Sequence, residues 1–276
     1  MNSRWRCLAA VVMSVAPLAA ACDVKVGENG GLSVDLSAGR ATDEWVRTYE
    51  IKPGGRLDII NVNGQIHASP SSGSQVEVRA VREVRSRSEE ASRERLRTLE
   101  MREEVSPERV TIQGPPAENG AERGFARPQL TIRYELRIPA GLNVQLRTQN
   151  GEVRLENIEG IRIVASTTNG GVTGRGLSGA IDASTVNGGI EMDLASLTGD
   201  SKMQTVNGGI TISVAPGVSA DLDATVVNGR VRVEDGLAFS RTEESRQHVS
   251  GRIGSGGHRL VVQTTNGGVR LGTRGS

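Results

Sequence analysis

Short units of alternating apolar and polar residues recur along the C-terminal half of the chain. In the unit around Asn187, the apolar residues Ile181 and Ala183 stand six and four positions before the asparagine. Ile190 and Met192 follow it at the same two-residue interval, and polar residues occupy most positions between. This period-two alternation is typical of half-buried β-strands. Each unit therefore predicts two strands separated by a turn at Asn-Gly.

The turn is repeated seven times. Its copies are Asn63 and Gly64, Asn150 and Gly151, Asn169 and Gly170, Asn187 and Gly188, Asn207 and Gly208, Asn228 and Gly229, and Asn266 and Gly267. From the second copy on, the intervals are 19, 18, 20, 21 and 38 residues, so the last one predicts two periods with a degenerate copy between. Self-similarity at a fixed period indicates a stacked architecture. We expect Asn-Gly to supply positive φ angles at each turn, and its repetition indicates a scaffold rather than a site.

Two all-β architectures fit this pattern. In a meander of hairpins, each Asn-Gly pair closes a type I′ turn and the flanking strands pair with each other. In a β-solenoid or β-helix-like stack, each strand pairs in parallel with its equivalent one repeat along, and the asparagines form a hydrogen-bonded column. The near-constant period of about 19–20 residues favours the solenoid.

The N-terminal half adds strands and one charged segment. The stretch Ser86–Val105, SRSEEASRERLRTLEMREEV, has opposite charges at i,i+4 spacing and few apolar residues, so it predicts a solvated helix over 86–105. Residues 115–128 are rich in Pro, Gly and charge and predict a loop. Residues 235–251 predict an irregular insertion in place of the missing repeat. We expect a partner to contact these excursions rather than the uniform coils.

The first residues predict export. Met1–Ala21 combines Arg4 and Arg6 with a short apolar run and small residues, as a signal peptide does. The stretch LAAAC ends at Cys22 and resembles the lipobox of bacterial lipoproteins, although an ordinary cleavage site before a cysteine also fits. Cys7 would leave with the leader, and acylation would explain the lone Cys22. We therefore expect an exported envelope protein tethered to the membrane through a lipid on Cys22.

These observations predict four segments. Residues 1–21 are the signal peptide, and 22–50 are a tether with a first strand. Residues 51–142 are an N-terminal β region that contains the charged helix and the loop. Residues 143–276 are the repeat domain with its insertion.

Composition and charge exclude several functions. The chain has 33 Lys and Arg against 32 Asp and Glu, and only two each of Phe, Trp and Tyr, which argues against a nucleic-acid partner. His67, His248 and His258 lie far apart and lack metal-ligand spacing. No nucleophile elbow, phosphate loop or zinc motif is present. We expect no catalytic residues, no metal and no cofactor.

Two other functions stay open. Five aspartates on neighbouring repeats could form an envelope polysaccharide-active site, because paired carboxylates cleave glycosidic bonds. They are Asp182, Asp193, Asp200, Asp221 and Asp223, and the scarcity of aromatic platforms argues against this use. Alternatively, exposed ends of the stack could join copies of the chain into a structural assembly.

Three stretches together resemble the bacterial DUF4097 family: the unit TxNGGI, the segment RIPAGLNVQLRTQNGEVRL and the ending SGRIGSGGHRLVVQTTNGGVRL. The resemblance extends from about Leu57 to the C-terminus. Members of the family are described as putative adhesins with β-strand repeats. The resemblance implies an extracytoplasmic β-solenoid-like domain. From the leader, Cys22, the repeats and the lack of a catalytic constellation, we expect a non-enzymatic scaffold for binding, adhesion or envelope sensing, with an envelope protein or glycan as its partner. The resemblance offers no catalytic residues to carry over.

Overall fold

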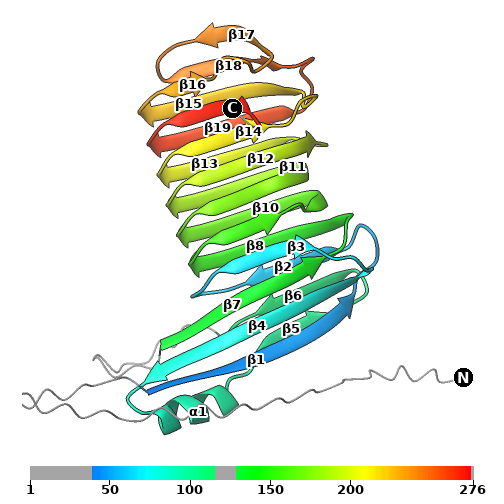
Figure 1. Cartoon of the computed structure of the whole chain (residues 1–276), viewed down its shortest axis with the longest axis vertical. Coiled ribbons are helices and arrows are strands. Elements are labelled where there is room, and N and C mark those ends of the chain that lie inside the picture. The colour runs from blue at the N-terminus through cyan, green and yellow to red at the C-terminus, as the bar shows by residue number, and fades with distance from the viewer. Residues whose placement is uncertain (1–38, 116–128, 275–276) are drawn as a thin grey trace, which may run out of the picture. The chain divides into compact units, whose positions relative to one another are not determined.

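The computed structural model describes residues 39–115 and 129–274, which fall within one compact unit, Ala38–Ser276. Cys22, the leader, the tether up to residue 38 and nearly all of the 115–128 segment lie outside the described residues. Within the described ranges the chain forms twenty strands and a single helix (Figure 1). The predicted all-β class with one helix in the N-terminal half is confirmed.

The strands build two ladders whose buried side chains form one main cluster. Ladder A runs in the order β5 (Arg102–Val105), β6 (Arg109–Gln113), β2 (Arg56–Ile60), β8 (Leu142–Asn150), β10 (Glu159–Asn169), the second part of β11 (Val172–Asn187), β13 (Ser201–Asn207), β19 (Arg259–Asn266), β15 (Ala220–Asn228), β18 (His248–Ile253) and β17 (Phe239–Glu244).

Ladder B runs in the order β1 (Gly39–Glu50), β4 (Gln75–Ser86), β7 (Gln129–Ile138), β3 (Ile66–Pro70), β9 (Val153–Glu156), the first part of β11, β12 (Ile190–Leu197), β14 (Ile210–Val214), β20 (Val269–Thr273) and β16 (Val231–Val233). We call one ladder-A strand, its Asn-Gly turn and the following ladder-B strand a coil.

The coils pair in parallel and in register. From β2 to β15 every ladder-A pair is parallel, and antiparallel pairs occur only at the two ends. Thus Ile163 lies between Val144 and Ile181, and Asn169 lies between Asn150 and Asn187. Because side chains alternate along a strand, the same repeat positions point into the core from every coil.

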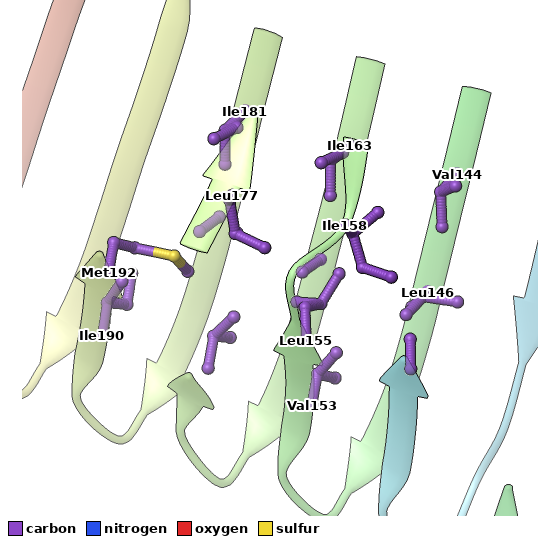
Figure 2. Close-up of a cluster of buried hydrophobic side chains, with 14 of the residues drawn as sticks. Val144, Leu146, Val153, Leu155, Ile158, Ile163, Leu177, Ile181, Ile190 and Met192 are labelled. Carbon is purple, nitrogen blue, oxygen red and sulfur yellow. The ribbon is translucent and has the colours of Figure 1, made fainter. Parts of the chain in front are cut away.

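The core between the ladders is aliphatic and stacked in columns. Ladder A contributes Val144, Leu146, Ile163 and Ile181, and ladder B contributes Val153, Leu155, Ile190 and Met192, all at most 2% exposed (Figure 2). Ile158 and Leu177 are buried at the bends that lead from one coil to the next, at the end of each coil opposite its Asn-Gly turn (Figure 2). A thin interior of this kind needs no aromatic residues, which explains their scarcity.

The coils do not stack in sequence order. The coil made by β19 and β20 lies between the coil of β13 and β14 and the coil of β15 and β16. After Val214 the chain therefore leaves one position of the stack open and forms the coil of β15 and β16 beyond it. It then returns through the hairpin of β17 and β18, and the coil of β19 and β20 occupies the open position.

The prediction of an irregular insertion at 235–251 is wrong, because the segment has regular β-structure. Most of this segment belongs to the antiparallel hairpin of β17 and β18, which extends ladder A beyond β15. The interval of 38 residues thus holds a hairpin and no degenerate Asn-Gly coil. The sequence concealed β17 because most of its side chains are exposed, so no apolar alternation marks it.

The predicted helix at 86–105 is too long. Helix α1 covers Glu89–Arg97, begins after Ser88, whose side chain accepts a hydrogen bond from Ala91 N, and ends at Thr98. Residues before it belong to β4, and Arg102–Val105 forms β5. Leu96 and Leu99 pack in a small cluster with Ala41 and Val84, so tertiary contacts end the helix where charge spacing alone would continue it.

Candidate functional site

The repeated asparagines form one continuous ladder along the turns. In stacking order they are Asn63, Asn150, Asn169, Asn187, Asn207, Asn266 and Asn228. Each Nδ2 donates to the Oδ1 of the preceding asparagine at 2.7–2.9 Å. The ladder includes the displaced last coil, because Asn266 lies between Asn207 and Asn228. These side chains therefore bind one another.

The glycine after each asparagine is required chiefly by close approach between coils. A Cβ on Gly188 would lie 2.0 Å from the carbonyl oxygen of Gly170, and one on Gly208 would lie 1.9 Å from that of Gly188. Gly151 and Gly170 have positive φ, but Gly188, Gly208 and Gly229 do not fall in that region. The expectation that Asn-Gly supplies positive φ at every turn is wrong, since the common requirement is the absence of a side chain.

Threonines inside the turns satisfy the same carbonyls. Thr185 Oγ1 donates to Gly170 O at 2.8 Å, and Thr205 Oγ1 donates to Gly188 O at 2.9 Å. Both side chains are buried, and a buried hydroxyl without such a partner is destabilising. The repeated Thr-x-Asn-Gly residues are thus engaged within the stack, and a binding surface has to be sought elsewhere.

The outward face of ladder A carries a line of free polar side chains. They occupy the position three residues before each asparagine and lie in register on neighbouring strands: Ser166, Ser184, Gln204, Gln263 and Thr225. We call these five residues the polar row. None has a side-chain hydrogen-bond partner among the described residues, and Arg147, beside Ser166 on β8, is likewise unpaired there. The row therefore presents unused donors and acceptors at each strand.

A groove of about 490 Å³ adjoins the polar row on the same face. Val164, Asp182, Lys202 and Val261 lie across it in register on β10, β11, β13 and β19. Arg162 and Arg259 also line it, and Ser184 and Gln204 belong to both groove and row. We call this depression the Lys202 groove. The groove was not predicted from the sequence, although an alignment of the repeats on their asparagines shows a hydroxyl or amide three residues before most of them.

The charged side chains of the groove are engaged by ion pairs or hydrogen bonds, with the exception of Lys202. Arg162 forms an ion pair with Asp182, and Arg259 Nη2 lies 2.8 Å from Asp223 Oδ2. Asp200 Oδ1 accepts a hydrogen bond from Arg259 N at 2.9 Å. Lys202 has no ion-pair or hydrogen-bond partner among the described residues. It is thus the free charge of the groove.

The five aspartates do not gather into one site. Asp182 and Asp200 line the Lys202 groove, whereas Asp193 lies on ladder B and pairs with Arg274 at 2.8 Å. Asp221 and Asp223 belong to β15, beyond the displaced coil. Four of the five form an ion pair or accept a backbone hydrogen bond. Such contacts are typical of surface carboxylates with a structural role.

The histidines are also dispersed. His67 Nε2 lies 3.6 Å from Glu156 Oε2, His248 Nε2 lies 3.4 Å from Asp223 Oδ1, and His258 Nδ1 lies 3.9 Å from Asp200 Oδ1. Within residues 39–115 and 129–274, no three His, Cys, Asp or Glu side chains gather as metal ligands. The helix in this part of the chain is too short and polar to cross a membrane.

The fold and the face define a protein of stacked parallel β coils with a polar outward surface. Residues 139–272 match the family model described as Toastrack DUF4097. The match covers the coils from β8 to β20 and with them the Lys202 groove. A search among curated proteins found no match.

Solved structures match this chain at low identity. A putative cell adhesion protein from Clostridium sporogenes is 13% identical, with a TM-score of 0.53, over 85% of this chain and 100% of that one. A putative adhesin from Bacteroides fragilis is 9% identical, with a TM-score of 0.33, over 83% and 97%. A putative lipid binding protein from Parabacteroides distasonis is 11% identical, with a TM-score of 0.27, over 84% and 97%. At these identities the first likeness shows the fold alone.

Proposed function

We propose that this protein is a non-enzymatic binding scaffold of the cell envelope, a β-solenoid that presents the outward face of ladder A to a partner. The observation that carries the proposal is the polar row beside the Lys202 groove, where donors and acceptors are held in register without partners in the described chain. The adhesion name of the Clostridium protein with the same fold agrees with a binding role.

Rigidity makes this face suited to binding. The asparagine ladder and the threonine–carbonyl hydrogen bonds hold each coil against the next. The polar row is therefore ordered before a partner arrives, and a preordered surface loses less conformational entropy on binding than a flexible loop does. We therefore propose that the partner binds the coils, whereas the sequence favoured the two excursions.

Substitution on ladder A tests the proposed binding face. We expect Ser184→Trp, introduced into the non-lipidated Cys22→Ser protein, to reduce co-sedimentation with isolated bacterial cell walls by about ten-fold, because the indole would fill the groove and interrupt the polar row. Thr211→Trp is the matched control, since Thr211 is equally exposed but lies on β14 of ladder B. Equal retention of the Cys22→Ser protein and both of its Trp variants would exclude ladder A as the binding face.

The membrane tether is a separate part of the proposal. We expect the full-length protein to incorporate a palmitate analogue in cells, and Cys22→Ser to abolish the label and release the protein from the membrane fraction. Cys7→Ser should leave labelling intact, because Cys7 falls within the proposed leader. Label that persists in the Cys22→Ser variant, or no label in the wild type, would disprove lipidation at Cys22.

A further inference from the structure

We propose that the ligand of this face is a linear acidic polysaccharide whose anionic group, a carboxylate or a sulfate, binds Lys202 while its hydroxyl groups bind the polar row. This inference rests on the proposed function and adds the chemical class of the ligand. Its three supports are the free cation of the groove, the engagement of the carboxylates around it, and the match between a repeating polymer and a repeating surface.

Lys202 is an unusual residue in this chain. The sequence has three lysines against 30 arginines, and Lys202 is the only lysine after Lys52. Its neighbours in register are Asp182 on one side and Val261 on the other, and Asp182 already pairs with Arg162. An ammonium group has three donors on a flexible stem, so it can follow an anionic group whose orientation varies along a polymer. Lys202 thus has charge and donors available for a ligand.

The surroundings of Lys202 leave its charge available to an anion. Arg162 and Arg259, which also line the groove, are paired with Asp182 and Asp223, so Lys202 is the cation without a carboxylate partner among the described residues. Arg147 adds a further unpaired cation at the β8 end of the polar row. The carboxylates that line the groove are engaged by Arg162 or by the backbone of Arg259, so repulsion of an incoming anion is reduced. Groups of opposite sign then steer and orient the ligand.

The polar row favours a polysaccharide over other polyanions. Its five side chains stand on successive strands about 4.8 Å apart, and each offers a hydroxyl or an amide that can donate and accept. A linear chain of sugars laid along the stack offers hydroxyl groups at a comparable repeat. No aromatic side chain lines the groove, so the stacking that unpaired nucleic-acid bases require is absent from it.

Differential lysine labelling tests the contact within one molecule. The full-length protein is acetylated with and without polygalacturonate, dextran sulfate or neutral dextran, and modification of Lys202 and Lys52 is followed by mass spectrometry. We expect an acidic polymer to slow modification of Lys202 about five-fold, because a bound anion covers the ammonium group. Lys52 is exposed and lies outside the groove, so its rate should not change. The carboxylate and sulfate arms show which anionic group is preferred.

Binding measurements complete the test. We expect Lys202→Gln to weaken binding of the preferred acidic polymer about ten-fold and to lower its salt dependence, while Lys52→Gln behaves as the wild type does. The inference is overturned if neither acidic polymer protects Lys202, if neutral dextran protects it equally, or if Lys202→Gln binds normally. If Ser184→Trp then loses binding to the cell wall while Thr211→Trp retains it, ladder A is still the binding face and only the ligand class is wrong.

Discussion

Replacing Gly188 with alanine is expected to lower the free energy of unfolding by about 3 kcal/mol, the upper range for overpacking a tightly packed interior. The added Cβ would lie 2.0 Å from the carbonyl oxygen of Gly170 and 2.5 Å from its carbonyl carbon. Both are backbone atoms held by parallel pairing on two sides, so neither can move without displacing a coil. The φ of Gly188 lies outside the left-handed region, and the cost therefore comes from approach rather than from backbone strain.

The next residue provides the control. A Cβ on Gly189 would lie 3.4 Å from Gly209 O, an ordinary contact, so Gly189→Ala should change the free energy of unfolding by less than about 1 kcal/mol. Urea titrations followed by far-ultraviolet circular dichroism compare the two variants. Equal losses in both would show that glycine is needed at the turn for its flexibility, against the close-approach argument.

The glycines show why part of this fold could be foreseen and part could not. Period-two alternation identifies strands from the chain alone, because burial on one face of a ladder imposes it. By contrast, a positive φ and a close approach of the backbone both require glycine, and the residue type alone does not show which requirement applies. Only the distances between coils separate the two causes at Gly188 and Gly208.

The candidate site was hidden for a related reason. Inward positions repeat from coil to coil, but outward positions vary, so no single coil marks a surface as functional. The aspartates were considered because carboxylates carry chemistry, yet the structure distributes them over two ladders and engages most of them in pairs. The informative signals were the position three residues before each asparagine and the rarity of lysine. Both can be read from the sequence, but only the stacking of the coils shows that the Lys202 groove joins residues about a hundred positions apart.

The order of the coils is the feature that the sequence conceals most completely. Every coil offers its neighbours the same asparagine, the same inward columns and the same register, so several stacking orders satisfy the pattern equally well. In the structure, β15 is held on one side by β19 and on the other by the hairpin strand β18, and β16 pairs with β20 alone. The coil of β19 and β20 therefore joins the coil of β15 and β16 to the rest of the stack.

This order leads to the second prediction. Val262 is fully buried in β19, in register between Met203 and Ala224. We expect Val262→Asp to cost about 4 kcal/mol, because it places an unpaired carboxylate in the aliphatic core. Hydrogen exchange should show β15 and β16 losing protection together with β19 and β20, while β8 and β10 stay protected.

A substitution at the outward-facing Val261 distinguishes the effect of a buried charge from a general effect of substitution in β19. Val261 lies on the groove side of the same strand, in register between Lys202 and Asp223, and Asp223 is already paired with Arg259. Val261→Asp therefore places its carboxylate beside a free cation and in contact with water. That variant should keep the exchange pattern of the wild type. If Val262→Asp instead deprotects β19 and β20 alone, then β15 and β16 do not depend on the last coil, and the stack is held together by local hairpin contacts rather than by the inserted strand pair.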